Sequence, residues 1–408
     1  MPIDTGDTTW MLISTGLVML MTPALGFFEA GLIRSKNSLS VLMQTFSGLA
    51  ILSTLWFVIG FTLVFAPSQN GIIGGLDWLF FYNVPFNDSL DYAPTIPGVT
   101  FASYQMMFAV ITPLLMTGAF AERLKWSSFF IFIIAWSLLV YYPLAHWVWG
   151  RGWLADLGVF DFAGGIVIHT SAGLGSLAAA LILGRRKNFG PDIMVPHNIP
   201  LAVIGAAMLW IGWFGFNAGS ALASGALAAN TLLVTHIASA TSAMVWIFLS
   251  WKRSGKPSTT AVINGAIAGL AGVTPAAGFI DAQSSFVLGI VLGFASYYAI
   301  LLLKEHWKID DALDVSSVHG VTGIVGSLAI GILATQIVNP AGPNGLLFGN
   351  PMQFAIQALG VAVAAVMGFA GTVVIMKLID RTIGLKVKEE EEDIGLDITQ
   401  HAERAYVS

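Results

Sequence analysis

The stretch DFAGGIVIHTSAG, from Asp161 to Gly173, places a histidine about eight residues inside a long apolar segment. A second stretch, DALDVSSVHGVTG, from Asp311 to Gly323, repeats its spacing: an aspartate, a histidine eight residues later, and a glycine four residues after that. Ionisable residues are rare inside membrane spans and usually have a function there. The repeated spacing therefore predicts two equivalent positions in a fold built from two related halves.

The composition places the chain in a membrane. Of the 408 residues 56% are hydrophobic and 10% are charged, whereas soluble domains carry about 25% charged residues. The 44 glycines fit closely packed membrane helices. The absence of cysteine excludes disulfides and thiol chemistry. The composition predicts an all-α polytopic membrane protein located in the cell membrane.

Eleven segments are long and apolar enough to be transmembrane helices, each of which needs about 20 such residues. The predicted spans are about 9–33, 38–66, 99–121, 126–149, 162–184, 199–222, 228–251, 258–280, 284–304, 313–336 and 352–379. This count leaves no room for a separate soluble domain.

The basic residues indicate the orientation, because cytoplasmic loops are enriched in Lys and Arg. The first eight residues hold two Asp and no basic residue, so we expect the N-terminus outside. With that start, the outer loops together hold only Arg151. Every other loop arginine or lysine then falls on the cytoplasmic side, where the C-terminus also lies.

Two further sequence echoes support a repeat. FEAG from Phe28 corresponds to FNAG from Phe216, and Ile111-Thr112-Pro113 corresponds to Val273-Thr274-Pro275. Because five is an odd number of crossings, the second copy of a five-span unit lies in the membrane with the opposite orientation to the first. Many transporters are built from such inverted repeats. We therefore predict a membrane domain over 1–380, with repeat one at about 9–184, repeat two at about 199–336 and a last helix at about 352–379. Residues 381–408 form a cytoplasmic regulatory tail.

The two histidines are expected near the middle of the membrane. Eight residues of helix span about 12 Å, and the hydrocarbon core is about 30 Å thick. His169 and His319 would then approach each other across the pseudo-two-fold axis. Such a pair favours a solute or proton path. The alternatives are two histidines that hold helices together by hydrogen bonds and a metal site, for which the sequence offers no third ligand.

Polar and aromatic residues gather at the predicted outer side. Asp161 is expected to cap the fifth span, where a carboxylate accepts from free backbone amides; its alternative role is to supply a field for a cation. Trp153 is typical of an interfacial belt. Other rings can bind a cation on their faces, and the Ser220 hydroxyl can add an acceptor.

Two further acidic features, at the inner ends of spans and in the tail, have simple structural interpretations. Glu29 lies near the inner end of the first span and close in sequence to Arg34, so we expect a paired or snorkelling carboxylate. We expect the same of Glu122, which lies beside Arg123. The tail carries a block of five acids, which is typical of disorder. Its apolar Ile394, Leu396 and Ile398 indicate instead that it docks.

Several motifs together resemble the ammonium transporter family (Amt/Mep/Rh). They run in family order along nearly the whole chain: YQMMFA, GAFAERLKW, HWVWG, DFAGGIVIHTSAG, GWFGFNAGSA, DDALDVSSVHGVTGIVG and the tail EEEEDIGLDITQHAERAY. The FEAG motif at Glu29 departs from the FYAG form of many bacterial members. The resemblance implies an eleven-helix protomer, assembled as a homotrimer with one pore in each protomer.

The resemblance also implies roles for individual residues. Ammonium recruitment at the outer side would use Trp149, Phe108 and Ser220, supported by Asp161. The outer gate would be formed by Phe108 and Phe216, and the pore would hold the twin histidines. The tail is similar to the segment through which a PII-type nitrogen regulatory protein acts.

These observations predict a transporter rather than an enzyme. A bare cation pays a prohibitive desolvation cost in hydrocarbon and neutral ammonia a far smaller one. We therefore expect ammonium to be recruited, deprotonated near the rings and passed as ammonia, with or without a relayed proton. The alternative is an ammonium sensor that uses the same pore. No nucleophile and base indicate an intramembrane enzyme, and we expect no cofactor, metal or nucleic acid.

Overall fold

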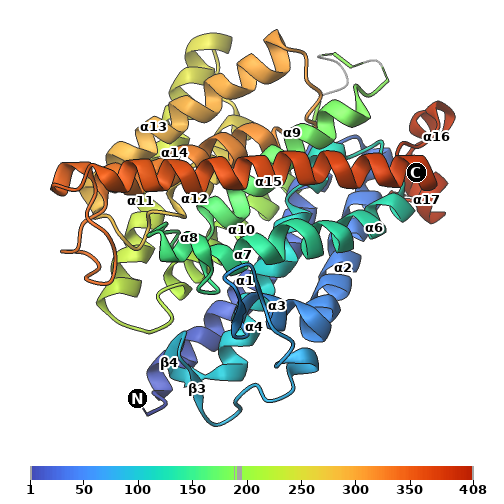
Figure 1. The fold of residues 1–408 in the computed structure, drawn as a ribbon. Coiled ribbons are helices and arrows are strands. Elements are labelled where there is room, and N and C mark those ends of the chain that lie inside the picture. Colours follow the sequence, from blue (N-terminus) through green and yellow to red (C-terminus); the bar gives the residue numbers. More distant parts are fainter. Residues whose placement is uncertain (1, 188, 191–194, 407–408) are drawn as a thin grey trace.

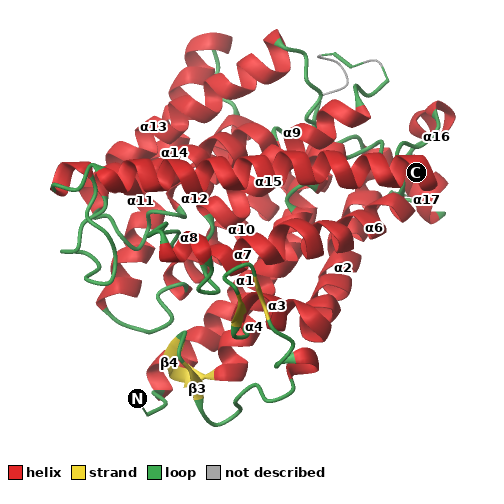
Figure 2. Ribbon diagram, viewed as in Figure 1, coloured by secondary structure: helices red, strands yellow, loops and turns green. Residues whose placement is uncertain are grey.

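The computed structural model describes residues 2–187, 189–190 and 195–406, and most of them are helical (Figure 2). The α-helices are α1 (Thr5–Leu32), α2 (Ser38–Leu55), α3 (Phe61–Phe65), α4 (Gly98–Leu114), α5 (Thr117–Phe120), α6 (Trp126–Trp136), α7 (Tyr142–Val148), α8 (Trp153–Asp156), α9 (Ser171–Leu183), α10 (Ile199–Gly219), α11 (Ala226–Ser254), α12 (Thr259–Val273), α13 (Ala282–Ile300), α14 (Thr322–Leu333), α15 (Met352–Thr382), α16 (Glu389–Ile394) and α17 (Leu396–His401).

Shorter elements interrupt or join these helices. Segments of π-helix are η2 (Trp56–Gly60), η4 (Ser137–Tyr141), η5 (Gly165–Thr170), η7 (Leu301–His306) and η8 (Ser316–Val321). Single 3₁₀ turns are η1 (Ser35–Asn37), η3 (Leu79–Phe81) and η9 (Leu346–Phe348). Between α3 and α4 the chain forms two antiparallel pairs, β1 (Ser68–Gln69) with β2 (Ile73–Gly74), and β3 (Ser89–Leu90) with β4 (Ala93–Pro97).

The described helices agree with the predicted spans except at one place. Ten helices or continuous helical runs are long and apolar enough to cross a membrane in the part of the chain that the structure describes. The eighth predicted span, 258–280, forms only the 15-residue α12 and then turns as far as Ile280. The protein is therefore a multi-pass membrane protein, and the count of eleven spans stays a prediction.

Side-chain caps fix where several spans begin. Asp4 accepts from the Asp7 amide at the start of α1, and Asn198 accepts from the Leu201 amide at the start of α10. Ser258 and Asp281 cap α12 and α13 in the same way. Free backbone amides at a helix start need such acceptors. Polar residues at the span borders thus set the helix boundaries.

The helices pack in the pairs that two related halves would produce. Spans 1 and 6 lie against each other along α1 and α10, and spans 5 and 10 meet through α9 with η8 and α14 with η5. The long helix α15, red in Figure 1, packs along α9 and α14. These are two of the three span pairs that the sequence echoes connect.

The two ends of α1 define two faces of the bundle. The N-terminal end lies beside β4, where the Asp4 amide donates to the Thr95 carbonyl, and we call this end the vestibule face. The other end of α1 leads to Arg34 and the docked tail, and we call it the tail face. The N-terminus and the tail thus occupy opposite ends of α1, as an odd number of crossings would produce.

Glycine allows the central helices to come into backbone contact. A Cβ on Gly173 of α9 would lie 2.2 Å from the Gly320 Cα and amide nitrogen in η8. A Cβ on Gly326 would lie 1.7 Å from the Gly272 carbonyl oxygen. Small residues at helix crossings permit this close approach in membranes. The Gly173 contact sets the separation of the two segments that carry the histidines.

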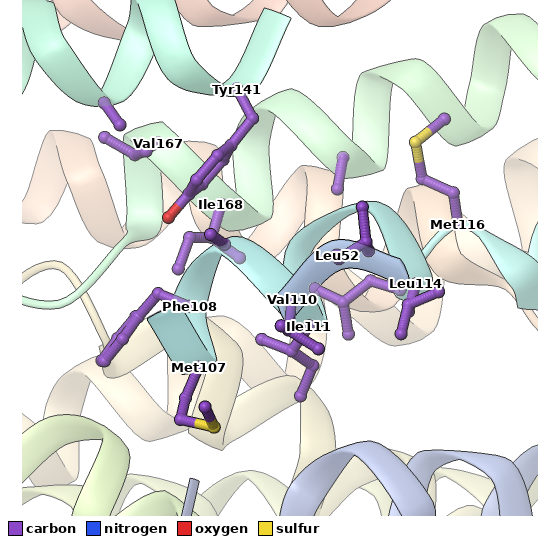
Figure 3. Packing of buried hydrophobic residues seen from close by; sticks show 14 of the residues in the cluster. Leu52, Met107, Phe108, Val110, Ile111, Leu114, Met116, Tyr141, Val167 and Ile168 are labelled. Carbon is purple, nitrogen blue, oxygen red and sulfur yellow. The ribbon is translucent and has the colours of Figure 1, made fainter. Parts of the chain in front are cut away.

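Large apolar side chains fill the remaining core. Helix α4 lies at its centre, with Phe108, Ile111 and Leu114 buried among Leu52, Tyr141 and Ile168 from neighbouring elements (Figure 3). The core is therefore continuous across the first half of the chain and the middle of the bundle.

Buried ion pairs close the tail face. Arg186 donates to Glu122 Oε2 over 2.7 Å and to Asp310 Oδ1 over 2.8 Å, and Arg123 donates to Asp310 Oδ2 over 2.8 Å. Burial by itself raises the pKa of the Glu122 carboxyl, but Arg186 and Arg34 outweigh it and hold that pKa below its ordinary value. Burial also raises the pKa of the Asp310 carboxyl, but Arg186 and Arg123 outweigh it and hold that pKa below its ordinary value.

This cluster corrects one expectation. Glu122 pairs with Arg34 and Arg186 and not with its neighbour Arg123, whose side chain turns toward Asp310. Near the start of span 10, the Asp311 side chain accepts from the Ser316 amide. Asp314 instead pairs with Lys304 at 2.7 Å.

The tail docks on the tail face, and of the three apolar residues on which this expectation was based Leu396 is buried, whereas Ile394 and Ile398 are exposed. The Asn37 side chain accepts from the Leu396 amide over 2.8 Å, and the Asp397 carboxylate accepts from the Ser40 amide over 2.8 Å. The Tyr406 hydroxyl lies 3.1 Å from Nε2 of His197. The tail is therefore ordered against η1, α2 and the chain before α10. Residues 407 and 408 of the predicted tail lie outside the described residues.

The first prediction concerns the backbone contact. We expect Gly173→Ala to lower the thermal unfolding temperature of the purified protein, because overpacking costs about 1–3 kcal/mol and the obstructing atoms are backbone. A Cβ on Gly16 of α1 meets nothing within 4 Å, so Gly16→Ala is the matched control. Equal unfolding temperatures for the two variants would contradict the contact.

The second prediction concerns pH. A carboxyl whose pKa is lower in the folded state contributes stability that is present above its unfolded pKa and is lost as pH falls through the folded pKa. For Glu122 and Asp310 we expect a constant unfolding temperature from pH 7 to about 5 and a fall below about pH 4. In Glu122→Gln the unfolding temperature should be lower at pH 7 and fall less in acid. A rise below pH 5 in the wild-type protein would be the opposite result.

Candidate functional site

A cavity of about 340 Å³ opens between the helices at the vestibule face. Its walls include Phe108 of α4, Trp149 after α7, Asp161 and Ser220. These are the four residues that the sequence predicted for recruitment, and the structure brings them together from four separate parts of the chain. We call this cavity the vestibule.

Hydrogen bonds fix the polar groups of the vestibule. Trp149 Nε1 donates to the Asp161 carbonyl oxygen over 2.8 Å. The Tyr104 hydroxyl lies 2.9 Å from the Gly215 and Phe216 carbonyl oxygens and 3.2 Å from Ser220 Oγ. The tryptophan ring and the serine hydroxyl therefore have defined positions on the cavity wall.

Asp161 caps the interrupted start of span 5. Its Oδ1 accepts from the Gly164 and Gly165 amides, and its Oδ2 accepts from the Ile166 and Val167 amides, all over 2.7–3.0 Å. Gly164 has a φ of 124°, a conformation that favours glycine. Both carboxylate oxygens are thus occupied by the backbone.

Two phenylalanine rings separate the vestibule from the interior. The centroids of Phe108 and Phe216 are 4.4 Å apart, and the planes are inclined at 42°. Trp149 meets Phe108 edge-on with centroids 6.2 Å apart. Phe108 lines the vestibule, while Phe216 lines the small cavity beyond it. The pair therefore lies where a gate was predicted.

The two histidines meet directly behind these rings. Nδ1 of His169 lies 3.2 Å from Nδ1 of His319, and their rings are 5.1 Å apart and inclined at 18°. Both residues are buried, and each lies in a π-helical segment, η5 or η8. π-Turns are frequent at functional sites. The pair predicted from the spacing is therefore present with its rings nearly parallel.

The cavity beside the histidines is narrow and mostly apolar. Its volume is about 20 Å³, which is room for about one water-sized molecule. Its lining includes Leu25, Phe28 and Leu115 together with both histidines. Such a passage disfavours a hydrated ion and admits a small neutral molecule.

Sequence reasoning missed two supporting residues. Trp213 stacks on His169 with centroids 5.6 Å apart, and its Nε1 donates to Thr274 Oγ1 over 2.9 Å. Tyr104 is the second: its hydroxyl lies 3.2 Å from Ser220 Oγ, a contact that the sequence does not show. The signal for Trp213 was its position three residues before Phe216, on the same helix face.

The expectation for Glu29 was wrong. The residue is only 2% exposed and forms no ion pair within the described residues. Its Oε2 lies 2.7 Å from Thr117 Oγ1. Arg34, its expected partner, follows the end of α1 and turns to Glu122.

The described residues contain no group of three or more His, Cys, Asp or Glu side chains suited to a metal ion. The arrangement can instead concentrate a small cation against ring faces and one hydroxyl oxygen. Behind the rings it offers an apolar passage with two imidazoles.

Comparisons with known proteins agree with this arrangement. The model of the Ammonium Transporter Family matches residues 9–406. The chain is 57% identical to "Ammonium transporter 1" of Dictyostelium discoideum over 99% of this chain and 88% of that protein. It is 45% identical to "Ammonium transporter Amt1" of Archaeoglobus fulgidus over 98% of this chain and 99% of that protein.

Solved structures share the fold. Mep2 of Saccharomyces cerevisiae superposes with a TM-score of 0.88 at 34% identity, over 95% of this chain and 91% of that chain. A protein described as "Sensor Amt Protein" superposes with a TM-score of 0.89 at 29% identity, over 97% of this chain and 98% of that chain.

The cap at Asp161 gives the third prediction. Asp161→Ala leaves four buried amides without their acceptor, and each such loss costs about 1–3 kcal/mol. We therefore expect a large fall in unfolding temperature, and an intermediate fall for Asp161→Asn, which keeps one acceptor oxygen. The exposed Asp156 of α8 is the control, and Asp156→Ala should leave the unfolding temperature unchanged. A wild-type value for Asp161→Ala would contradict the capping role.

Proposed function

The chain belongs to the ammonium transporter family, and from this premise we propose that it carries ammonium across the cell membrane. The observation that best supports this proposal is the order of the site: a vestibule lined by aromatic rings, two closely packed rings and then a histidine pair at a small apolar cavity. Its family is one of transporters and not of enzymes.

We propose that the vestibule face lies outside the cell. The positive-inside rule supports this orientation, because Arg34, Arg123 and Arg186 gather at the tail face. The membrane domain over 1–380 then holds inverted repeats at about 9–184 and 199–336 and a last helix at about 352–379. The tail, 381–408, faces the cytoplasm.

Ammonium would first bind in the vestibule. The faces and edges of Trp149 and Phe108 offer cation–π contacts of about 0.5–2 kcal/mol, and Ser220 Oγ offers an acceptor. Asp161 adds a negative field without a free lone pair, since four amides occupy its carboxylate. The site would thus attract a small cation and hold it only weakly.

Passage beyond the rings would begin with loss of a proton. The closely packed rings of Phe108 and Phe216 disfavour a hydrated ion, and a neutral ammonia molecule pays much less to leave water than its cation does. A single ammonia molecule fits the space at the histidines. The released proton either returns outward or is relayed inward.

The histidine geometry bears on that choice. Two Nδ1 atoms 3.2 Å apart share a hydrogen bond only if one carries a proton and the other offers a lone pair. At least one ring is therefore neutral in this arrangement. The Nε2 of that ring then carries the proton. When the other ring is also neutral, its Nε2 offers a lone pair, and the pair has both a donor and an acceptor for ammonia. These are the groups that a proton relay needs.

The second candidate function is an ammonium sensor. It is favoured by the structural likeness to the protein described as "Sensor Amt Protein". The docked tail provides a surface through which pore occupancy would reach a separate partner. For either function we propose a homotrimer and, at the tail face, a PII-type nitrogen regulatory protein as partner.

Liposomes with purified protein distinguish these functions. Radiolabelled methylammonium uptake would be recorded together with the current evoked by ammonium. Uptake with current supports coupled proton transfer, and uptake without current supports passage of ammonia alone. If neither is observed in sealed liposomes, transport is excluded and the sensor remains.

The fourth prediction concerns the histidines. In the double variant His169→Ala, His319→Ala the passage becomes wider and loses its imidazoles, so we expect selectivity for ammonium over K⁺ to fall at least about tenfold. The measurement is the ratio of ammonium and K⁺ currents in proteoliposomes. The exposed His306 provides the control variant His306→Ala. Unchanged uptake, current and selectivity in the double variant would exclude these residues from the pore.

A further inference from the structure

Glu29 is a buried carboxyl that this transport scheme leaves unused. It lies on α1 in the FEAG motif, is 2% exposed and has no cationic partner within the described residues. A carboxylate buried without a counter-charge is costly in a membrane. The residue therefore requires an explanation in terms of its protonation and its neighbours.

The hydrogen bonds around Glu29 fit a protonated side chain. Thr117 Oγ1 lies 2.7 Å from Glu29 Oε2 and 2.5 Å from the Leu114 carbonyl oxygen. The hydroxyl has one proton to donate, and the carbonyl oxygen has none. If the Thr117 hydroxyl donates its proton to the Leu114 carbonyl oxygen, it cannot also donate to Glu29. The contact between Thr117 and Glu29 is then a hydrogen bond only when the Glu29 carboxyl is protonated and donates. The geometry thus accommodates a carboxylic acid that donates to Thr117.

Glu29 also lies directly on the tail side of the histidines. A Cβ on Gly118 would lie 2.9 Å from both Glu29 Oε1 and Val315 Cγ2, so the two atoms flank one small space. Val315 is four residues, about 6 Å of helix, before His319. The cavity at the histidines is lined by Leu25, one helical turn before Glu29, and by Phe28, the residue before it. The carboxyl is therefore about one helical turn beyond the pair.

Three aspartates near this position have backbone or cationic partners for at least one carboxylate oxygen. Asp311 accepts from the Ser316 amide, Asp314 pairs with Lys304, and Asp310 belongs to the arginine cluster. These groups and His319 are the titratable neighbours that face Glu29 from the segment before and within span 10. Glu29 differs from Asp310 and Asp314 because it has no cation as its partner within the described residues; its polar contacts are with the Thr117 hydroxyl and the Gly118 backbone.

We propose that Glu29 is the tail-side proton station of the pore, which takes a proton from the histidine pair and returns it to ammonia as it leaves. This role rests on the proposed transport function and extends it to coupled proton transfer. It assigns the glutamate of FEAG to the pore, where the sequence suggested only a paired or snorkelling carboxylate.

The proposed steps balance in atoms and charge. A protonated histidine pair transfers one proton to the Glu29 carboxylate, which gives a neutral pair and a carboxylic acid. The acid then transfers that proton to the nitrogen lone pair of ammonia, which gives ammonium and restores the carboxylate. One ammonia and one proton thus leave together as ammonium, and no other reactant is needed.

The test compares Glu29→Gln with wild-type protein in proteoliposomes. Glutamine keeps the size and the contact with Thr117 but carries no exchangeable acid proton. We expect the ammonium-evoked current to fall about 10²-fold, near the lower end of what a positioned proton donor contributes. The half-saturating ammonium concentration should stay unchanged, because the vestibule is intact, and the pH dependence of the remaining current should flatten.

Two variants serve as controls. Glu29→Asp keeps a carboxyl and should retain a pH-dependent current well above that of Glu29→Gln. Glu305 is a half-exposed glutamate paired with Arg253 on the same side, and Glu305→Gln should behave as wild type. Unfolding temperatures show whether each variant is folded.

Several results would overturn the proposal. A folded Glu29→Gln with wild-type current and pH profile excludes the station, and so does wild-type uptake without any current, although transport itself then stands. If wild-type protein shows neither uptake nor current, the transport function fails first. If Glu29→Gln does not fold, infrared difference spectra decide: ammonium should perturb a carboxylic-acid C=O band that shifts in Glu29→Asp, and identical bands in both proteins contradict the proposal.

Discussion

The contact between Gly173 and Gly320 is the constraint on which the site depends. It brings the backbones of spans 5 and 10 closer than any side chain would allow, and His169 and His319 stand one turn and one residue away from it. The π-helical segments at the same two places rotate the histidine rings toward each other. A backbone that departs from the α-helix inside a membrane must have its polar groups satisfied by the protein. Asp161 does this for span 5 by accepting hydrogen bonds from four amides. The Asp161 cap, the contact between Gly173 and Gly320, and the histidine pair therefore depend on one another.

Much of the fold follows from simple sequence rules, because long apolar segments can only be satisfied as helices in hydrocarbon. The positions of nearly all spans and the pairing of His169 with His319 were predictable from hydropathy and spacing. The shortening of α12 was not, since the turns from Thr274 to Ile280 are stabilised by contacts with the Asp161 segment, for example from the Phe162 amide to the Pro275 carbonyl oxygen. The π-helical segments were also beyond sequence reasoning, because they depend on the crossing of distant helices.

Side-chain roles were predictable only where a repeat or a resemblance marked them. Trp213 stacks on His169 from a helix more than 40 residues away, and local sequence does not show that contact. Glu29 was misinterpreted because nearness in sequence to Arg34 was taken as nearness in space. The chain leaves the helix at Ile33, so Arg34 reaches Glu122 while Glu29 stays inside the bundle. A helix end thus separates two charges that are five residues apart.

The two predicted repeats differ in the polar groups that they place at equivalent positions. On the vestibule side, the Asp161 carboxylate is saturated by backbone amides and is suited to act as a fixed negative field. On the tail side, its counterpart Asp311 accepts from one amide and leaves Oδ1 without a partner within the described residues. Glu29, which has no acidic counterpart at the matching Asn217 of the FNAG motif, adds a second carboxyl there. The backbone thus holds the two aspartate carboxylates differently, and the proposed roles of cation attraction at the vestibule side and proton transfer at the tail side depend on that difference.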